Sequence, residues 1–201
     1  MSNIFLTSDT HFGHGRSFIT EPRGFSSVEE MNETIIEKWN KIVKPEDIVY
    51  HLGDVMLNDN EKGIECIKRL NGKIFLILGN HETENRRDML LTECAHKIDG
   101  GWYSYVIKHN KLSIYLSHYP TITANYNDKF FSQHVINFHG HTHQKFNFMF
   151  PNNPFIYHVG VDSHDCTPIN IEEAIAEVKQ RYYDLQTLNI PFFTEPFYTA
   201  Q

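Results

Sequence analysis

Three short apolar runs, each ending directly in polar residues, constrain what this chain can fold into more than any other feature. The runs cover residues 4–8, 48–52 and 74–78. Each is typical of a buried β-strand that stops abruptly at a turn. The third run ends at Gly79, Asn80, His81 and Glu82. In an open α/β sheet, ligands bind at the carboxyl ends of the strands, so these residues mark a candidate site.

The segments between these runs predict helices, which favours a parallel sheet. Apolar residues from Val28 to Ile42 recur at intervals of three and four, and Ser26 and Glu29 have capping-box spacing. A second helix is predicted from residues 58–60 to Asn71-Gly72. Strands and helices that alternate in this way are typical of the α/β class.

Beyond residue 102 the pattern changes to consecutive strands followed by one helix. The predicted strands cover residues 103–109, 111–117, 135–138 and 155–161, and the helix follows Asn170. We find no internal repeat or linker and expect one domain over residues 1–201. The tail over residues 184–201 contains phenylalanines among prolines. We expect this tail to pack on the domain or on a second subunit of a homodimer.

Composition excludes several classes of partner. The 201 residues carry 25 acidic and 18 basic side chains, a net charge of −7. This balance argues against strong non-specific binding to nucleic acid or to an anionic membrane. No apolar run has membrane-spanning length, and no secretory signal is recognisable. The three cysteines form no disulfide pattern, so we expect a reducing, cytoplasmic location.

The polar residues after the strands have the chemistry of metal ligands. Asp9 and His11 are two positions apart, as are His141 and His143, which places each pair on one side of an extended chain. The candidate ligands are Asp9, His11, Asp54, Asn80, His118, His141 and His143. Seven such ligands exceed the needs of one transition metal, and a bridging Asp54 would divide them into two sets of four. Imidazole with carboxylate suits manganese, iron, zinc, nickel or cobalt.

Two bound cations predict hydrolysis of a phosphate ester. Their charge exceeds what Asp9 and Asp54 cancel, and the excess would stabilise a bridging hydroxide and an anionic phosphoryl group. The leaving alkoxide still needs a proton. His81 could supply it, with Glu82 orienting or charging its imidazole.

Residues close to these blocks are candidates for substrate binding. They are His14, Arg16, Arg86, Tyr119, the segment 121–126 including Tyr126, and Lys145. Two other residues and one short stretch are given structural interpretations. Arg23 is interpreted as a solvated loop charge, and His51 is expected to pack into the scaffold. The stretch from Asp162 to Asp165, which includes His164, is interpreted as a loop before the last helix rather than as a second metal cluster.

Taken together, the five blocks resemble the calcineurin-like metallophosphoesterase family. They are Asp9-x-His11, Gly53-Asp54, Gly79-Asn80-His81-Glu82, His118 and Gly140-His141-x-His143. They occur in family order over residues 9–143. The longer stretches Ser8-Asp9-Thr10-His11-Phe12-Gly13-His14 and His51-Leu52-Gly53-Asp54 also resemble a short single-domain subgroup from bacteria and their phages. A phage-encoded member would act in the host cytoplasm.

The resemblance implies a four-layer α/β/β/α sandwich of the metallo-dependent phosphatase type. It also implies a dinuclear centre, for which we expect manganese. One metal would be held by Asp9, His11, Asp54 and His143, and the other by Asp54, Asn80, His118 and His141. His81 corresponds to the catalytic histidine. Glu82 stands where many members have aspartate, which leaves its orienting role less defined.

Several functions share such a centre. We favour a phosphodiesterase on small substrates such as cyclic nucleotides, because the sequence carries no obvious cap domain or nucleic-acid groove. The alternatives are a phosphomonoesterase, a nuclease, or a non-catalytic scaffold that binds a protein. His141-x-His143 also suggests a metallo-β-lactamase-type hydrolase, but that family has an Asp-His pair soon afterwards, and Gln144-Lys145 follow here.

Overall fold

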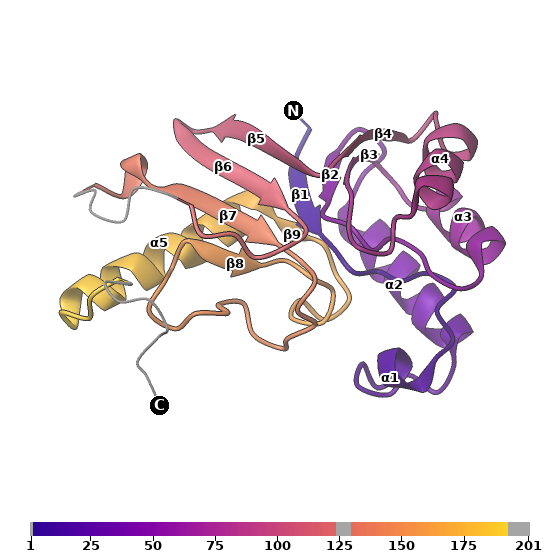
Figure 1. The fold of residues 1–201 in the computed structure, drawn as a ribbon, viewed down its shortest axis with the longest axis horizontal. Coiled ribbons are helices and arrows are strands. Elements are labelled where there is room, and N and C mark those ends of the chain that lie inside the picture. Colours follow the sequence, from indigo (N-terminus) through magenta and orange to yellow (C-terminus); the bar gives the residue numbers. More distant parts are fainter. Residues whose placement is uncertain (1, 124–129, 193–201) are drawn as a thin grey trace.

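The chain forms two β-sheets with helices packed against them (Figure 1). The computed structural model describes residues 2–123 and 130–192. The elements in chain order are β1 (Ile4–Thr7), α1 (Ser17–Thr20), α2 (Val28–Ile42), β2 (Ile48–His51), α3 (Asn60–Lys68), β3 (Lys73–Ile77), α4 (Glu84–Glu93), β4 (Ile98–Trp102), β5 (Ser104–His109), β6 (Leu112–Ser117), η1 (Phe131–Gln133), β7 (Val135–His139), β8 (Ile156–His158), β9 (Ile169–Asn170) and α5 (Ile171–Thr187).

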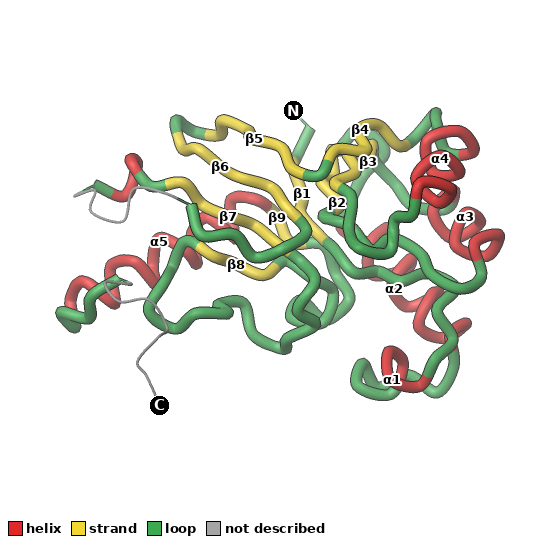
Figure 2. The backbone as a smooth tube through the Cα atoms, viewed as in Figure 1, coloured by secondary structure: helices red, strands yellow, loops and turns green. Residues whose placement is uncertain are grey.

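The first sheet contains the three strands that the sequence indicates most clearly. Its order is β4-β3-β2-β1-β9, with β1 to β4 parallel and β9 antiparallel to β1. Helices α2, α3 and α4 connect the parallel strands and gather beside the sheet (Figures 1 and 2). Parallel pairing places the ends of β1, β2 and β3 at one edge of this sheet.

The second sheet has the order β5-β6-β7-β8. A hairpin joins β5 to β6, whereas β6, β7 and β8 run parallel to one another. The two sheets meet at a parallel bridge between Ser8 and Gly160. The carboxyl ends of β6 and β7 therefore lie close to those of the first sheet.

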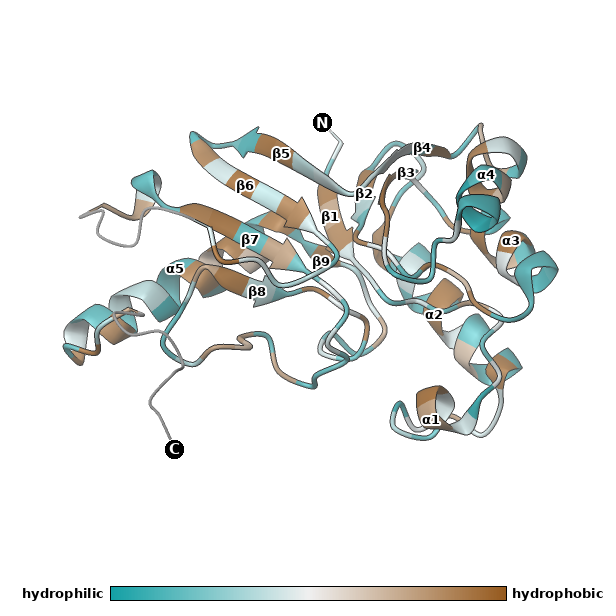
Figure 3. Cartoon of the chain, viewed as in Figure 1, coloured by the Kyte–Doolittle hydropathy of each residue, from teal (hydrophilic) through white to brown (hydrophobic). Residues whose placement is uncertain are grey.

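Two buried apolar clusters hold the layers together. The first lies between the five-stranded sheet and α2 to α4 and includes Met31, Trp39 and Leu76. The second joins the two sheets and α5, and includes Leu6 from β1 and Phe138 from β7. Figure 3 shows hydrophobic residues concentrated along the strands and hydrophilic ones on the outer turns of the helices. The mixed α/β fold with two sheets and helices, as expected for the calcineurin-like phosphoesterases, is confirmed.

The structure corrects several boundaries. The N-cap of α2 is Ser27, whose hydroxyl accepts from the Glu30 amide, while the Glu30 carboxylate accepts from Ser26. The predicted capping box was therefore displaced by one residue. Helices α1 and α4 and strands β4 and β9 were not predicted. Leu90 is the only buried residue of α4. The helix therefore needs no apolar stripe, and its sequence gives no helical pattern of apolar residues to predict it from.

The C-terminal region is partly described. Helix α5 continues to Thr187, so the first residues assigned to the tail are helical. The Phe192 ring packs against Tyr182, with 5.2 Å between ring centroids. Residues 193–201 lie outside the described part of the chain, and contact with a second subunit stays a prediction. Among the described helices, none has the length and apolar character needed to cross a membrane.

Candidate metal centre

The seven candidate ligands come together where the two sheets meet. Asp9 and His11 follow β1, Asp54 follows β2, Asn80 follows β3, His118 follows β6, and His141 and His143 follow β7. Most of these side chains are buried. Asp9, His11, Asp54 and His118 each have a relative exposure of 1% or less. The parallel connections of both sheets thus place residues from distant parts of the sequence around one small volume.

On one side, two imidazoles face two carboxylates. Nε2 of His11 lies 3.2 Å from Nε2 of His143. It also lies 3.7 Å from Oδ2 of Asp54, and His143 Nε2 lies 3.8 Å from Oδ1 of Asp9. This is the set that the resemblance assigns to the first metal.

On the other side, two imidazoles face an amide oxygen. His118 Nε2 and His141 Nδ1 each lie 2.9 Å from Oδ1 of Asn80. His118 Nε2 also lies 3.5 Å from Oδ2 of Asp54. The same Asp54 oxygen therefore faces both groups, as a bridging carboxylate would.

The donor atoms fit divalent cations. Potential ligand atoms of Asp9, His11 and His143 lie within 4.8 Å of one another, and so do those of Asp9, Asp54 and His118. Nitrogen and oxygen donors in this mixture match first-row transition metals. Ring nitrogens of His11 and His143 that point at each other at 3.2 Å either share one proton or direct both lone pairs at a cation. This cluster of histidine and aspartate side chains therefore has the donor atoms of a divalent-metal site.

The ligand backbone adopts a conformation that non-glycine residues avoid. The φ angles of Asp9, His11, Asp54, His141 and His143 are 59°, 47°, 57°, 70° and 49°. Backbone strain of this kind costs about 1–3 kcal/mol per residue and persists only where the surroundings enforce it. Five of the seven candidate ligands therefore sit on backbone that the rest of the fold must hold in place.

Glycines allow the ligand loops to approach closely. A Cβ atom on Gly53, whose φ is +92°, would lie 2.6 Å from the Gly79 amide nitrogen and 2.7 Å from Nδ1 of His118. A Cβ on Gly140 would lie 2.5 Å from Oδ2 of Asp9. Any larger residue would separate the ligands.

Burial strongly affects the charges of the site. Desolvation raises the pKa of Asp9, although His143 and His118 act in the opposite direction. Desolvation lowers the pKa of His11 well below its usual range, and Arg23 and His143 add to the effect. Desolvation also lowers the pKa of His141. Metals bind imidazoles in their neutral form. A neighbouring cation also stabilises the ionised form of a buried carboxylate.

His81 is placed at the open side of the cluster. Its imidazole is partly exposed, with a side-chain exposure of 39%, and Nε2 lies 3.9 Å from Oδ2 of Asp54. Its backbone amide donates to Oδ1 of Asp54 at 3.0 Å. His81 is therefore close to the candidate ligands, with its ring accessible from the solvent side.

Glu82 has a different role from the one expected. Its carboxylate accepts hydrogen bonds from the backbone amides of Asp54, Val55 and Gly79, at 2.8, 2.8 and 2.7 Å. Both oxygens are thereby occupied by backbone groups of the loops after β2 and β3. The carboxylate thus ties two ligand loops together and does not orient the His81 imidazole.

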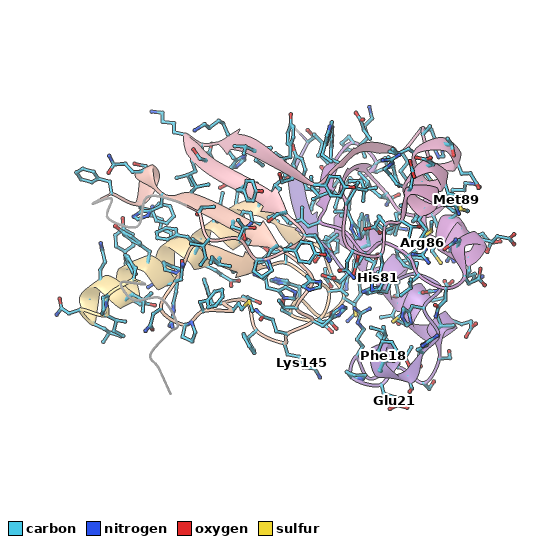
Figure 4. The ribbon with its side chains drawn as sticks, in the orientation of Figure 1. Phe18, Glu21, His81, Arg86, Met89 and Lys145 are labelled. Atoms are coloured by element: carbon cyan, nitrogen blue, oxygen red, sulfur yellow. The ribbon has the colours of Figure 1, made fainter. Side chains whose placement is uncertain are left out.

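A cleft of about 670 Å³ opens in front of the cluster. His14, Arg16 and Lys145 line it, in agreement with their selection from the sequence. Four apolar residues that sequence analysis did not select also line the cleft and form its apolar wall: Phe18, Ile19, Pro22 and Leu57. Figure 4 labels His81, Phe18 and Lys145 around this cleft.

The other substrate candidates have structural contacts. The Arg86 guanidinium donates to the backbone oxygen of His81 and to Oδ1 of Asn60, so it does not line the cleft. The Tyr119 ring packs edge-on against His141, with 4.7 Å between centroids. Tyr126 lies outside the described residues.

Sequence analysis misinterpreted Arg23 and did not predict the contacts of Asp162. Arg23 is not a solvated charge, whereas Asp162 lies in a turn before β9 and α5, in agreement with the loop interpretation. Their side chains are 2% and 7% exposed and form an ion pair, and Asp162 also contacts Nδ1 of His143. No local pattern joins positions 23, 143 and 162, so only the fold could reveal these contacts. His51 packs into the scaffold as predicted, stacked on Trp39.

Comparison with known proteins identifies relatives. The family model of the calcineurin-like phosphoesterase superfamily domain matches residues 2–156. An uncharacterised protein of Methanocaldococcus jannaschii is 41% identical over 117 residues, which cover 57% of this chain and 62% of the archaeal protein. The match thus spans less than two thirds of that relative. The Gene 66 protein of Mycobacterium phage D29 is 27% identical over 90% of this chain and 99% of its own length.

A solved structure also resembles the fold. A protein of unknown function from Aquifex aeolicus is 28% identical, with a TM-score of 0.64. The alignment covers 88% of this chain and 99% of the Aquifex protein. The arrangement of two sheets and helices is therefore shared over nearly the full length of that protein.

Proposed function

We propose that this chain, which belongs to the calcineurin-like phosphoesterase superfamily, hydrolyses a small phosphodiester with the help of two divalent cations. The observation that carries this proposal is the convergence of seven nitrogen and oxygen donors at one side of a cleft. Such a site can neutralise a phosphoryl group that the acidic chain as a whole would repel.

The residues divide between the cations according to their contacts. Asp9, His11 and His143 would hold the first cation, and Asn80, His118 and His141 the second. Asp54 faces both groups and would bridge them. When bound, the cations supply charge neutralisation and a water of lowered pKa, and we propose manganese as the preferred metal.

His81 is proposed as the proton donor. Its imidazole lies beside Asp54 and is exposed on the cleft side, where a leaving alkoxide would emerge. The Arg86 hydrogen bond to the His81 backbone oxygen fixes the base of the side chain. A protonated imidazole within hydrogen-bond reach of the leaving oxygen can deliver the proton that the alkoxide needs.

The residues that line the cleft favour a diester rather than a monoester as the proposed substrate. A diester carries an organic group on each side of the phosphate, and the cleft offers an apolar wall next to the donor cluster. Its volume of about 670 Å³ is in the range of sites for small molecules. Arg16 and Lys145 add positive charge at the same cleft. These features suit cyclic nucleotides or compounds of similar size.

A substrate screen tests the proposal. Metal-free protein is reconstituted with Mn²⁺ and assayed with phosphomonoesters, linear diesters, and 2′,3′- and 3′,5′-cyclic nucleotides at matched concentrations. We expect kcat/KM for at least one diester to exceed that for every monoester by more than tenfold. Preference for monoesters would contradict the diesterase proposal, and no turnover of any ester would contradict the enzymatic one.

A further inference from the structure

Arg23 and Asp162 form an ion pair beside the candidate metal centre, and Asp162 also lines the cleft. Nε of Arg23 donates to Oδ1 of Asp162 at 2.8 Å, and Nη2 donates to Oδ2 at 2.9 Å. The two side chains are 2% and 7% exposed. This two-bond geometry uses the planar fork of the guanidinium, which a lysine cannot reproduce.

Each member of the pair also contacts a ligand segment. Oδ2 of Asp162 lies 2.9 Å from Nδ1 of His143. Nη2 of Arg23 donates to the backbone oxygen of Asp9 at 2.8 Å, and Nη1 donates to that of Thr10 at 3.4 Å. The pair therefore links the loop after β1 to the loop after β7, which belong to different sheets.

The segments that the pair contacts carry unfavourable backbone conformations. Asp9, His11 and His143 all have positive φ angles. The guanidinium binds the peptide oxygens of Asp9 and Thr10, which lie within this stretch. Removing these hydrogen bonds would let the loop relax toward commoner backbone angles and move the ligand side chains apart.

The contact with His143 also selects its chemical form. In a neutral imidazole, a ring nitrogen that donates its proton to a carboxylate leaves the other nitrogen with a free lone pair. With Nδ1 facing Asp162, Nε2 of His143 points toward His11 and Asp9. This is the orientation that a metal ligand requires.

We propose that Arg23 and Asp162 are positioning residues that pre-organise the first of the two metal sites. Asp162 fixes the ring and tautomer of His143, and Arg23 holds both Asp162 and the Asp9 loop. Asp162 lies beyond residues 2–156, the part of the chain that the family model matches. The inference rests on the proposed metal centre but not on any particular substrate.

Metal titration tests the inference without an activity assay. Metal-free wild-type protein and Asp162→Asn are titrated with Mn²⁺ in a calorimeter. We expect affinity at one of the two sites to fall by about 10- to 100-fold, the usual effect of losing such a partner, while the other site is unchanged. Asp165→Asn is the matched control. It removes a carboxylate from the same turn, where Asp165 is 91% exposed and pairs with Lys38.

Arg23→Lys provides an independent test that keeps the positive charge. Lysine cannot bind both Asp162 oxygens and the Asp9 peptide oxygen together, so we expect the same site to be weakened. If Asp162→Asn does not fold, the Mn²⁺ titration is done with Arg23→Lys alone. Wild-type Mn²⁺ affinity in a folded Asp162→Asn or Arg23→Lys protein would overturn the inference. A wild-type protein that binds two Mn²⁺ ions but cleaves no ester would refute the proposed function alone.

Discussion

At the scale of single residues, two residues of the same chemical type can make different contacts according to where they lie in the fold. Glu82 and Asp162 are both buried carboxylates close to candidate ligands. The Glu82 carboxylate accepts hydrogen bonds from backbone amides and ties two loops together, whereas the Asp162 carboxylate contacts the ring of His143. The convergence of the candidate ligands could be predicted because strand endings and residue types mark them. The partners of Glu82, Arg23 and Asp162 could not, because they depend on contacts between distant segments.

His81 and Asp54 are predicted to fail in different ways. His81→Ala should retain two bound Mn²⁺ ions and lose turnover by about 100-fold or more, because the proton donor is removed while the ligands stay. Asp54→Ala should lose metal as well, because its carboxylate faces both ligand groups. Metal content after dialysis and kcat on the best diester measure both effects. Equal kcat for His81→Ala and wild type would reject the proposed proton donor.

Glu82→Gln is predicted to destabilise the fold. An amide nitrogen cannot accept a hydrogen bond, so at least one of the three backbone amides would lose its partner in a buried place. The free energy of unfolding should fall by about 1–3 kcal/mol. Denaturant unfolding of the metal-free proteins measures this change. Exposed Glu84, at the start of α4, provides the matched control variant Glu84→Gln, which should unfold like wild type.

At the scale of elements, strongly patterned segments were predictable and weakly patterned ones were not. Strands β1, β2 and β3 and helices α2, α3 and α5 have apolar faces that the sequence displays. Helix α4 buries only Leu90, β9 has two residues, and α1 has four. Their positions are set by packing and by neighbouring strands rather than by local pattern. Helix α1 contributes Phe18 and Ile19 to the apolar wall of the cleft.

Phe18 on α1 is predicted to contact the organic part of the substrate. Its side chain lines the cleft although it is 63% exposed. If a planar base packs on this ring, Phe18→Ala should raise KM for a nucleotide diester by about tenfold with little change in kcat. Tyr103→Ala is the control, because Tyr103 is 78% exposed and does not line the cleft. A KM that is unchanged in Phe18→Ala would show that this wall does not bind the substrate.

At the scale of the whole molecule, buried neutral histidines make the stability of the fold depend on pH. His51 and His158 are both buried, and desolvation lowers the pKa of each to about 3. The Thr10 hydroxyl donates to the backbone oxygen of Val55, so Nε2 of His51 must donate to Thr10. Nδ1 of His51 has no hydrogen-bond partner within the described chain. These histidines therefore belong to the folded state in their uncharged form.

Acid is predicted to destabilise the metal-free protein in a defined range. The unfolded chain protonates its histidines below about pH 6.5, whereas His51 and His158 resist protonation in the folded state until about pH 3. Stability is therefore present above pH 6.5 and is lost as the pH falls through this interval. The loss is up to about 1.4 kcal/mol per pH unit for each histidine. Denaturant unfolding at several pH values should show a shallower decline for His51→Gln, and an identical decline would contradict this assignment.

The most direct test of the account is a stepwise Mn²⁺ titration of metal-free protein, with bound metal and diester hydrolysis measured on the same samples. We predict that two ions bind per chain and that the rate becomes substantial only as the second site fills. A chain that binds no transition metal, or one that reaches its full rate with a single ion, would contradict the proposed dinuclear centre.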